Sequence, residues 1–183
     1  MGLKNSPNGY GWISIALHWL MALAVFGLFG LGYWMVDLDY YSEWYRQAPA
    51  LHKSIGMTLF IVWMGRIVWR YTQMTPQVLA THKSWEVKVA KLTHAFLYLL
   101  ILLIMLSGYL ISTADGRGIE VFSLFTVPSM GELIANQEDI AGDIHEWLAY
   151  IVIGLAVLHA LAALKHHFID KDQTLIRIVK TGN

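Results

Sequence analysis

The chain contains long apolar stretches with few or no charges. Three stretches carry no charge at all, at residues 12–36, 92–114 and 147–164. A fourth, at residues 51–71, carries Lys53 in its first turn and Arg66 and Arg70 near its end, where long basic side chains can reach the water. A helix needs roughly 20 apolar residues to cross a bilayer. The pattern therefore predicts four transmembrane helices, over about residues 12–36, 51–71, 92–114 and 145–165.

Charged residues divide sharply between the two sides of these four spans. One side, with both termini and the connection between the second and third spans, carries ten basic and three acidic residues, a net charge of +7. The other side carries three basic and ten acidic residues, a net charge of −7. Basic segments stay in the cytoplasm. We therefore expect an all-α integral membrane protein: a four-helix up-and-down bundle over residues 1–183, in one domain, with both termini cytoplasmic.

Composition agrees with this class and excludes several others. Apolar residues make up 56% of the chain and charged residues 14%, whereas soluble proteins have about 25% charged residues. The formal net charge is zero, so no overall basic field is available for nucleic acid. The chain has no cysteine, which excludes disulfides, iron–sulfur clusters and haem attached through cysteines. Eight histidines are left as candidate metal ligands.

Four of these histidines form two pairs at matching depths. His18 and His159 each lie six residues, or about 9 Å, from the expected cytoplasmic boundary. His52 and His145 both lie at the outer boundary. His145 precedes His159 by 14 residues, which on a helix means about 21 Å along the axis and only about 40° around it. The residue four positions after each histidine, which lies over it on the helix, is small: Ala22, Gly56, Ala149 and Ala163.

Bis-histidine ligation of two haems b explains these features best. His18 and His159 would be the axial iron ligands of an inner haem, and His52 and His145 those of an outer haem, because haems are held by side chains on facing helices. The alternative for each histidine is a hydrogen bond inside a helix interface. A zinc site is a weaker alternative, since its four ligands would lie at one level.

The other polar residues near these levels are weaker candidates. His94 also lies near the inner boundary, but the large Tyr98 stands four positions after it, so we interpret His94 as a candidate contact to a haem propionate or a quinone rather than as a ligand. Arg66 follows His52 by 14 residues and is a candidate partner of the inner haem's propionates. For the remaining histidines we expect plain solvation: His82, His166 and His167.

Several short segments give the chain a resemblance to a known family. They are Leu17-His18-Trp19, Leu51 to Gly56, Ile111 to Gly116, His145-Glu146-Trp147, Leu158-His159-Ala160 and the long run from Lys165 to Leu175. The sequence resembles the bacterial cytochrome b561 family, which is related to the b-type subunits of nickel hydrogenases, over nearly its whole length. The resemblance implies a four-helix inner-membrane protein with two haems b, ligands on the first, second and fourth helices, and electron exchange with quinone.

The function expected is electron transfer between the quinone pool and a donor or acceptor at the periplasmic face, in the lipid bilayer of the bacterial inner membrane. One class in the resembled family is a superoxide oxidase, which passes electrons from superoxide to ubiquinone, and this is the alternative enzymatic function. The net charge of −7 outside disfavours an anionic substrate, although Arg46, Lys53 or Arg117 would create a local basic funnel. A haem-free metal or proton transporter with a histidine ladder is the alternative from another class. No catalytic residue is assigned.

Overall fold

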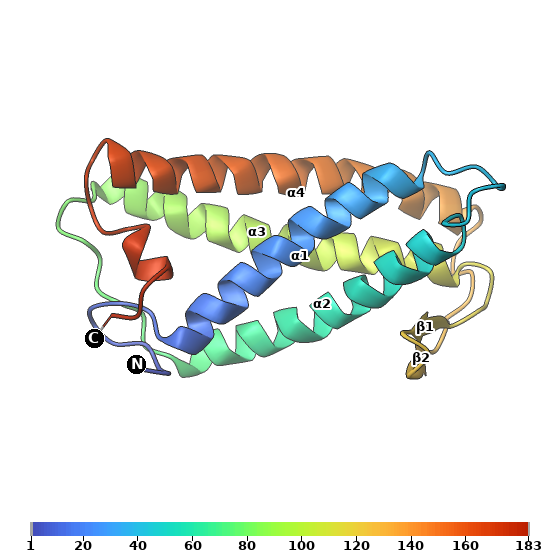
Figure 1. The fold of residues 1–183 in the computed structure, drawn as a ribbon, viewed down its shortest axis with the longest axis horizontal. Coiled ribbons are helices and arrows are strands. Elements are labelled where there is room, and N and C mark those ends of the chain that lie inside the picture. The colour runs from blue at the N-terminus through green and yellow to red at the C-terminus, as the bar shows by residue number, and fades with distance from the viewer. Residues whose placement is uncertain (1, 183) are drawn as a thin grey trace. The chain divides into compact units, whose positions relative to one another are not determined.

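The computed structural model describes residues 2–182 of the chain. Within them lie four long helices, α1 (Trp12–Met35), α2 (Gln47–Thr72), α3 (Ser84–Thr113) and α4 (Gln137–Phe168) (Figure 1). Two short strands, β1 (Ile119–Val121) and β2 (Phe125–Val127), lie between α3 and α4, and a 3-10 turn, η1 (Ile176–Ile178), follows α4. The expected four-helix, all-α fold is confirmed.

Two helices begin well before the apolar stretches that predicted them. Both α3 and α4 begin eight residues earlier than the expected spans, at Ser84 and Gln137. Glu86 lies in the first turn of α3, and Glu138 and Asp139 lie in the first turn of α4. Acidic side chains stabilise the positive end of the helix dipole. The acidic residues that precede these two apolar stretches therefore stabilise the first turns of α3 and α4.

The chain divides into two compact units, and each takes a part of every long helix. The described part of unit 1 consists of residues 2–22, 62–98 and 154–182, and unit 2 consists of residues 23–61 and 99–153. Unit 1 includes η1 and both terminal segments, whereas unit 2 includes β1 and β2.

Three of the helices are long and apolar enough to cross a membrane. These are α1, α3 and α4, and α2, which carries Lys53, Arg66 and Arg70, is not among them. Large apolar side chains are exposed along the three, such as Leu23 at 71%, Leu158 at 63% and Leu161 at 54%. Such a surface suits hydrocarbon, because helices in a bilayer associate through close packing and polar contacts rather than by hiding apolar area from water.

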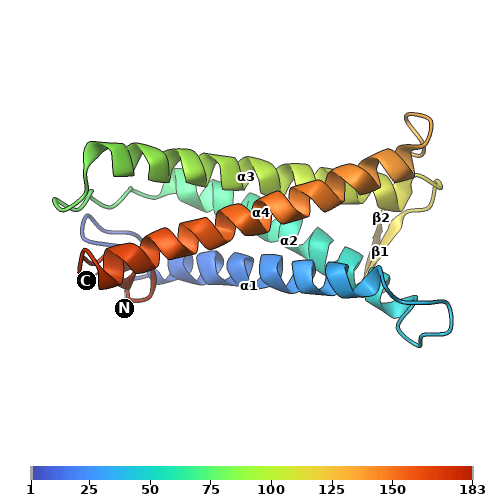
Figure 2. The same cartoon turned by 90° about the horizontal axis from the view of Figure 1, so that it is seen from above.

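The antiparallel hairpin of unit 2 was not predicted, beyond the semi-apolar character of residues 119–127. Ile119 pairs with Val127 and Val121 with Phe125, and Ile119 and Val121 are buried. The hydroxyl of Ser54 in α2 donates to the carbonyl of Glu120 at 3.4 Å and accepts from the backbone N–H of Phe122 at 3.1 Å. The hairpin is thereby attached to the first turns of α2, beside which it lies in both views (Figures 1 and 2).

In unit 1 the start of α1 is fixed by the side chain of Asn5. Its Oδ1 accepts a hydrogen bond from the backbone N–H of Gly11 at 2.9 Å and from the hydroxyl of Ser14 at 2.7 Å. The indole N–H of Trp69 in α2 donates to the same hydroxyl at 3.0 Å. The first turn of α1 is therefore tied to the last turn of α2, four residues before His18.

The two terminal segments of the described chain lie side by side in unit 1 (Figures 1 and 2). The N–H of Gly182 donates to the carbonyl of Tyr10 at 3.3 Å, and the hydroxyl of Ser6 donates to the carbonyl of Gly182 at 3.0 Å. The indole N–H of Trp19 in α1 donates to the carbonyl of Ile178 at 2.8 Å. Residues 6–19 are thus bonded to residues 178–182.

Candidate functional site

The outer histidine pair lies within unit 2. His52 comes from the first turns of α2 and His145 from α4, and their ring centroids are 6.2 Å apart with the planes at 67°. Both side chains are half-buried. The structure therefore brings together His52 and His145, the two histidines that the sequence pairs at the outer level.

Glycines on the two neighbouring helices make room for these rings. A Cβ added to Gly32 in α1 would lie 3.2 Å from Cε1 of His52, and one added to Gly108 in α3 would lie 3.1 Å from Cε1 of His145. On α2 itself, a Cβ added to Gly56 would meet no heavy atom of the described chain within 4 Å. Gly32 and Gly108 allow close approach to the imidazoles, and Gly56 leaves space over His52.

Ser107 of α3 sets the tautomer of His145. Its hydroxyl donates its one proton to the carbonyl of Ile104 at 2.9 Å, so its oxygen can only accept from Nδ1 of His145, which lies 3.0 Å away. The proton of the neutral imidazole is therefore on Nδ1, and Nε2 keeps a free lone pair. This is the arrangement that a metal-binding histidine adopts.

The inner pair lies within unit 1. The ring centroids of His18 in α1 and His159 in α4 are 6.4 Å apart, with the planes at 71°. His94 of α3 also contacts His159, at a shorter centroid separation of 5.0 Å. Three imidazoles thus meet at this level, and the structure places His94 beside the expected pair.

The two separations can be compared with the geometry of a metal between two imidazoles. With metal–nitrogen bonds of about 2.0–2.1 Å and about 1.2 Å from nitrogen to ring centroid, two rings on opposite sides of one ion have centroids about 6.4 Å apart. The pairs His52–His145 and His18–His159 fit this value, whereas His94–His159 is more than 1 Å too short.

A guanidinium without a carboxylate partner lies beside the inner pair. Arg66 donates from Nη1 to the carbonyl of Leu17 at 3.2 Å, from Nε to the hydroxyl of Tyr98 at 2.9 Å, and from Nη2 to Nδ1 of His18 at 3.2 Å. Among residues 2–182 it forms no ion pair. Arg70 lies over the ring of Tyr98, at 5.4 Å from its centroid. Unpaired positive charge at this depth suits an anionic ligand group such as a carboxylate.

The hydrogen bond from Arg66 also affects His18. Arginine only donates, so Nδ1 of His18 accepts, and the proton of the neutral ring is on Nε2. Iron ligation through Nε2 requires that His18 give up this proton to Nδ1 and that Arg66 release Nδ1. The outer pair thus fits a bound metal in spacing and in the tautomer of His145, and the inner pair fits in spacing.

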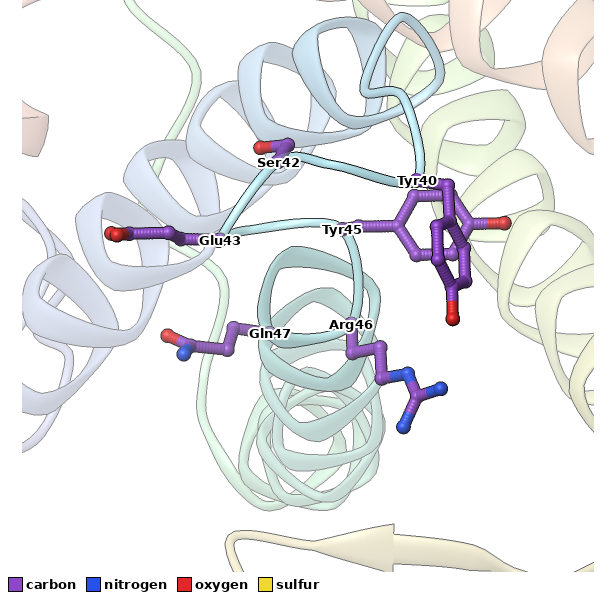
Figure 3. A pocket seen from close by; sticks show the side chains of 6 residues that line it. All are labelled: Tyr40, Ser42, Glu43, Tyr45, Arg46 and Gln47. Carbon is purple, nitrogen blue, oxygen red and sulfur yellow. The ribbon is translucent and has the colours of Figure 1, made fainter.

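A pocket in unit 2 lies elsewhere, between the connection from α1 and the first turn of α2. It has a volume of about 310 Å³ and is lined by Tyr40, Ser42, Glu43, Tyr45, Arg46 and Gln47 (Figure 3). It therefore includes neither His52 nor His145. The side chains of Arg46 and Glu43 point to different sides of it (Figure 3). Arg117 is paired with Asp115, whose carboxylate accepts from its Nε at 2.6 Å, and Lys53 also interacts with the charge of Asp115. Two of the three outer basic residues, Arg117 and Lys53, therefore have an acidic neighbour.

None of the three histidines for which we expected plain solvation fits that expectation: His167 is half-buried and its Nδ1 is out of contact with water. His82 and His166 lie against the carboxylate of Asp172, with side chains only 18% and 14% exposed. Sequence reasoning missed this contact because His82 and Asp172 are 90 residues apart and neither belongs to the periodic face of a helix.

Comparison with known proteins decides the family. The sequence pattern of the family described as Prokaryotic cytochrome b561 matches residues 9–181. The chain belongs to this family. It is 49% identical to cytochrome b561 homolog 2 of Escherichia coli over 98% of this chain and 95% of that protein. It is 29% identical to a probable superoxide oxidase of Yersinia pestis over 93% of this chain and 95% of that protein, and 27% identical to cytochrome b561 homolog 1 of Escherichia coli over 94% and 97%.

Family membership confirms the resemblance seen in the sequence. The chain is a multi-pass membrane cytochrome, and its family implies b-type haem. Because a cytochrome carries haem, membership argues against the haem-free transporter considered above.

Proposed function

We propose that this cytochrome binds two haems b and transfers electrons between the quinone pool and a donor or acceptor at the periplasmic face of the bacterial inner membrane. The observation that carries the proposal is the separation of the two histidine pairs, 6.2 and 6.4 Å, each in its own unit and each close to that expected for two imidazoles that bind one metal ion.

Each pair would hold one haem. His52 and His145 would ligate the outer haem, and His18 and His159 the inner haem. When bound, haem b supplies a carrier for single electrons. The protein contributes ligation and orientation: Ser107 holds the proton on Nδ1 of His145 and leaves Nε2 free for iron.

Positive charge would position the inner haem. Arg66 would donate to a haem propionate in place of Nδ1 of His18, and the imidazole of His18 would then be free to bind iron. Arg70, which lies over the ring of Tyr98, and His94, which contacts His159, would be further partners of a propionate or the quinone head group. The cations of α2 thus explain why this helix is less apolar than the other three.

Superoxide oxidation is the second candidate, supported by the relative from Yersinia pestis. An anionic substrate needs positive potential at the outer face. Because Arg117 is paired with Asp115 and Lys53 also interacts with the charge of Asp115, only Arg46 of the three outer basic residues is left without an acidic partner in these contacts. We therefore rank electron exchange with a protein or a neutral molecule first.

The experiment that tests two-haem binding is the haem content of the purified protein and its variants. We expect two haems b per chain and the sharp reduced bands of six-coordinate haem. His52→Ala and His145→Ala should each remove one haem, and His18→Ala and His159→Ala the other. Reduction of the haems by a quinol then tests the quinone link, and stopped-flow mixing with superoxide tests the second candidate.

His167→Ala is a suitable control, because His167 lies at the end of α4 away from both pairs in sequence. It should keep both haems. A ratio of one haem per chain in the unmodified protein would contradict the proposal. Loss of haem in His94→Ala together with retention in His18→Ala would show that His94 is the inner ligand.

A further inference from the structure

A second cluster of metal-binding side chains lies in unit 1, beyond the histidine pairs. Nε2 of His82 lies 3.1 Å from Oδ2 of Asp172, and Nδ1 of His166 lies 3.3 Å from the same oxygen. All three atoms lie within 4.8 Å of one another. The rings of His82 and His166 face each other with centroids 4.7 Å apart. Two imidazoles and a carboxylate therefore converge on one point.

The spacing of these atoms is that of a small coordination sphere. In a tetrahedral zinc site, with bonds of about 2.0–2.1 Å, neighbouring ligand atoms lie about 3.3–3.4 Å apart. The two distances to Oδ2 of Asp172, 3.1 and 3.3 Å, are close to this edge length. The hydroxyl of Thr174 lies 2.9 Å from Nε2 of His82 and is a further oxygen at the cluster.

One nitrogen of the cluster lacks a well-aligned hydrogen bond. Nδ1 of His166 is buried and lies 2.8 Å from Oδ2 of Asp170 and 3.3 Å from Oδ2 of Asp172, but neither contact has hydrogen-bond geometry. A buried polar nitrogen without an aligned partner costs free energy, which a bound cation would offset. Neutral imidazole and carboxylate are ligands that zinc accepts.

Asp172 is held in position as an oriented ligand. Its side chain is 3% exposed, its Oδ1 accepts from the N–H of Thr174 at 2.8 Å, and Oδ2 accepts from the hydroxyl of Thr81 at 3.4 Å. Burial raises the pKa of Asp172. The hydrogen bonds from Thr174 and the nearby imidazoles together lower it by more, so the net pKa is below the usual value. The carboxyl is thus kept in the deprotonated form that binds a cation.

A neighbouring set of side chains, Glu86, His166 and Asp170, is a weaker site. Nζ of Lys165 already lies between its two carboxylates, 3.2 Å from Glu86 and 2.6 Å from Asp170. That ammonium neutralises the negative charge of the carboxylates, which a divalent cation would need for binding. No ammonium or guanidinium is paired with Asp172 among residues 2–182.

We propose that His82, His166 and Asp172 bind a zinc ion at the end of α4, with Thr174 or water as a fourth ligand. The ion would join the connection between α2 and α3 to the segment that follows α4. Because the ligands come from segments about 90 residues apart, its role is to stabilise the packing of that connection on the C-terminal segment, independently of haem binding.

The test uses the detergent-solubilised holoprotein, treated with a chelator and then titrated with zinc. We expect one zinc per chain by elemental analysis. The zinc-edge X-ray absorption spectrum should show two imidazole ligands. His82→Gln and Asp172→Asn should each weaken zinc binding by more than the roughly 10–100-fold that loss of an outer-sphere partner causes.

His167→Gln and Glu86→Gln are matched controls: the first changes the adjacent histidine and the second changes the competing set, and both should bind zinc as the unmodified protein does. The haem absorbance of each variant reports whether it has folded. If the two ligand variants do not fold, the spectrum of the unmodified protein decides alone. Fewer than two imidazoles at the zinc, less than one zinc per chain at saturation, or unchanged affinity in a folded Asp172→Asn would overturn the proposal.

Discussion

Replacing Gly32 by alanine should damage the outer haem site without touching a ligand. The new Cβ would lie 3.2 Å from Cε1 and 3.6 Å from Nδ1 of His52. Carbon atoms prefer separations of about 3.5–4.0 Å, so the imidazole must shift by roughly 0.3–0.8 Å. Metal–ligand distances vary by only about 0.2 Å. The shift must therefore appear as a twist of the His52 side chain.

The size of the effect follows from that twist. A side chain forced about 30° from its rotamer costs about 0.5–1.5 kcal/mol, which corresponds to roughly a two- to tenfold loss of affinity. We expect Gly32→Ala to lose its outer haem faster to an excess of a haem-binding scavenger protein, and the low-spin electron paramagnetic resonance signal of that haem to shift. The inner haem should be unchanged.

Gly30 provides the control on the same helix. A Cβ added there meets no heavy atom of the described chain within 4 Å. Both substitutions gain about 1 kcal/mol of helix propensity, so only the clash distinguishes them. If Gly32→Ala and Gly30→Ala release haem at the same rate with the same spectra, the close approach of Gly32 to His52 does not matter for ligation and the reasoning is refuted.

Three further predictions test the surroundings of the pairs and the outer face. Ser107→Ala removes the side-chain hydrogen-bond partner of His145 Nδ1 and should weaken outer haem binding by up to roughly 10–100-fold. Ser54→Ala, which removes the bonds of α2 to the hairpin, should not weaken it, and haem titration of the apoprotein measures both. Arg66→Gln removes a positive charge that favours the reduced inner haem, so its midpoint potential should fall, by about 1–2 kcal/mol or roughly 50–90 mV at an effective dielectric of 20; a rise in potentiometric titration would contradict this. A basic redox protein should exchange electrons with this cytochrome rapidly at low salt, and up to about 10–10³-fold more slowly when salt screens the acidic outer segments. A fast reaction with superoxide that salt slows would instead favour superoxide oxidation.

The helices and the histidine pairs were predictable because they follow from spacing along single helices. An apolar run longer than 20 residues has few alternatives to a membrane helix. His145 and His159, 14 residues apart on α4, must share a face, and each then needs one partner at its own depth. His18 and His52 met this requirement without knowledge of the packing.

The residues that complete the sites were not predictable in this way. Gly32, Ser107 and Gly108 act across helix interfaces, and the rotation of α1 and α3 about their axes is set by packing rather than by any period in the sequence. Helix periodicity indicates only the small residue four positions after each histidine on the same helix. Gly56 does leave space over His52, but the close contacts come from the neighbouring helices.

The hairpin and the cluster at Asp172 could not be predicted from sequence periodicity, for a different reason. Strands of three residues carry almost no alternation, and Ser54, which attaches the hairpin, is on another helix. His82, His166 and Asp172 meet because the chain reverses at Lys171, where φ is +55°. A left-handed residue that is neither glycine nor asparagine has no clear signature in the sequence.

The bonds between the terminal segments set an order of events during biosynthesis. Residues 6–19 are synthesised before residues 178–182, so the hydrogen bonds that join Ser6, Tyr10 and Trp19 to Ile178 and Gly182 form late. At about 5–20 residues per second, the ribosome needs roughly 8–32 s to go from Trp19 to Ile178. During that interval the beginning of α1 has no C-terminal partner. His18 lies next to Trp19, so we expect haem delivery to the inner pair and the bonding of the two terminal segments to be late, coupled steps of maturation. A nascent chain stalled before residue 178 would lack these bonds, which would make the beginning of α1 more accessible to quality-control proteases.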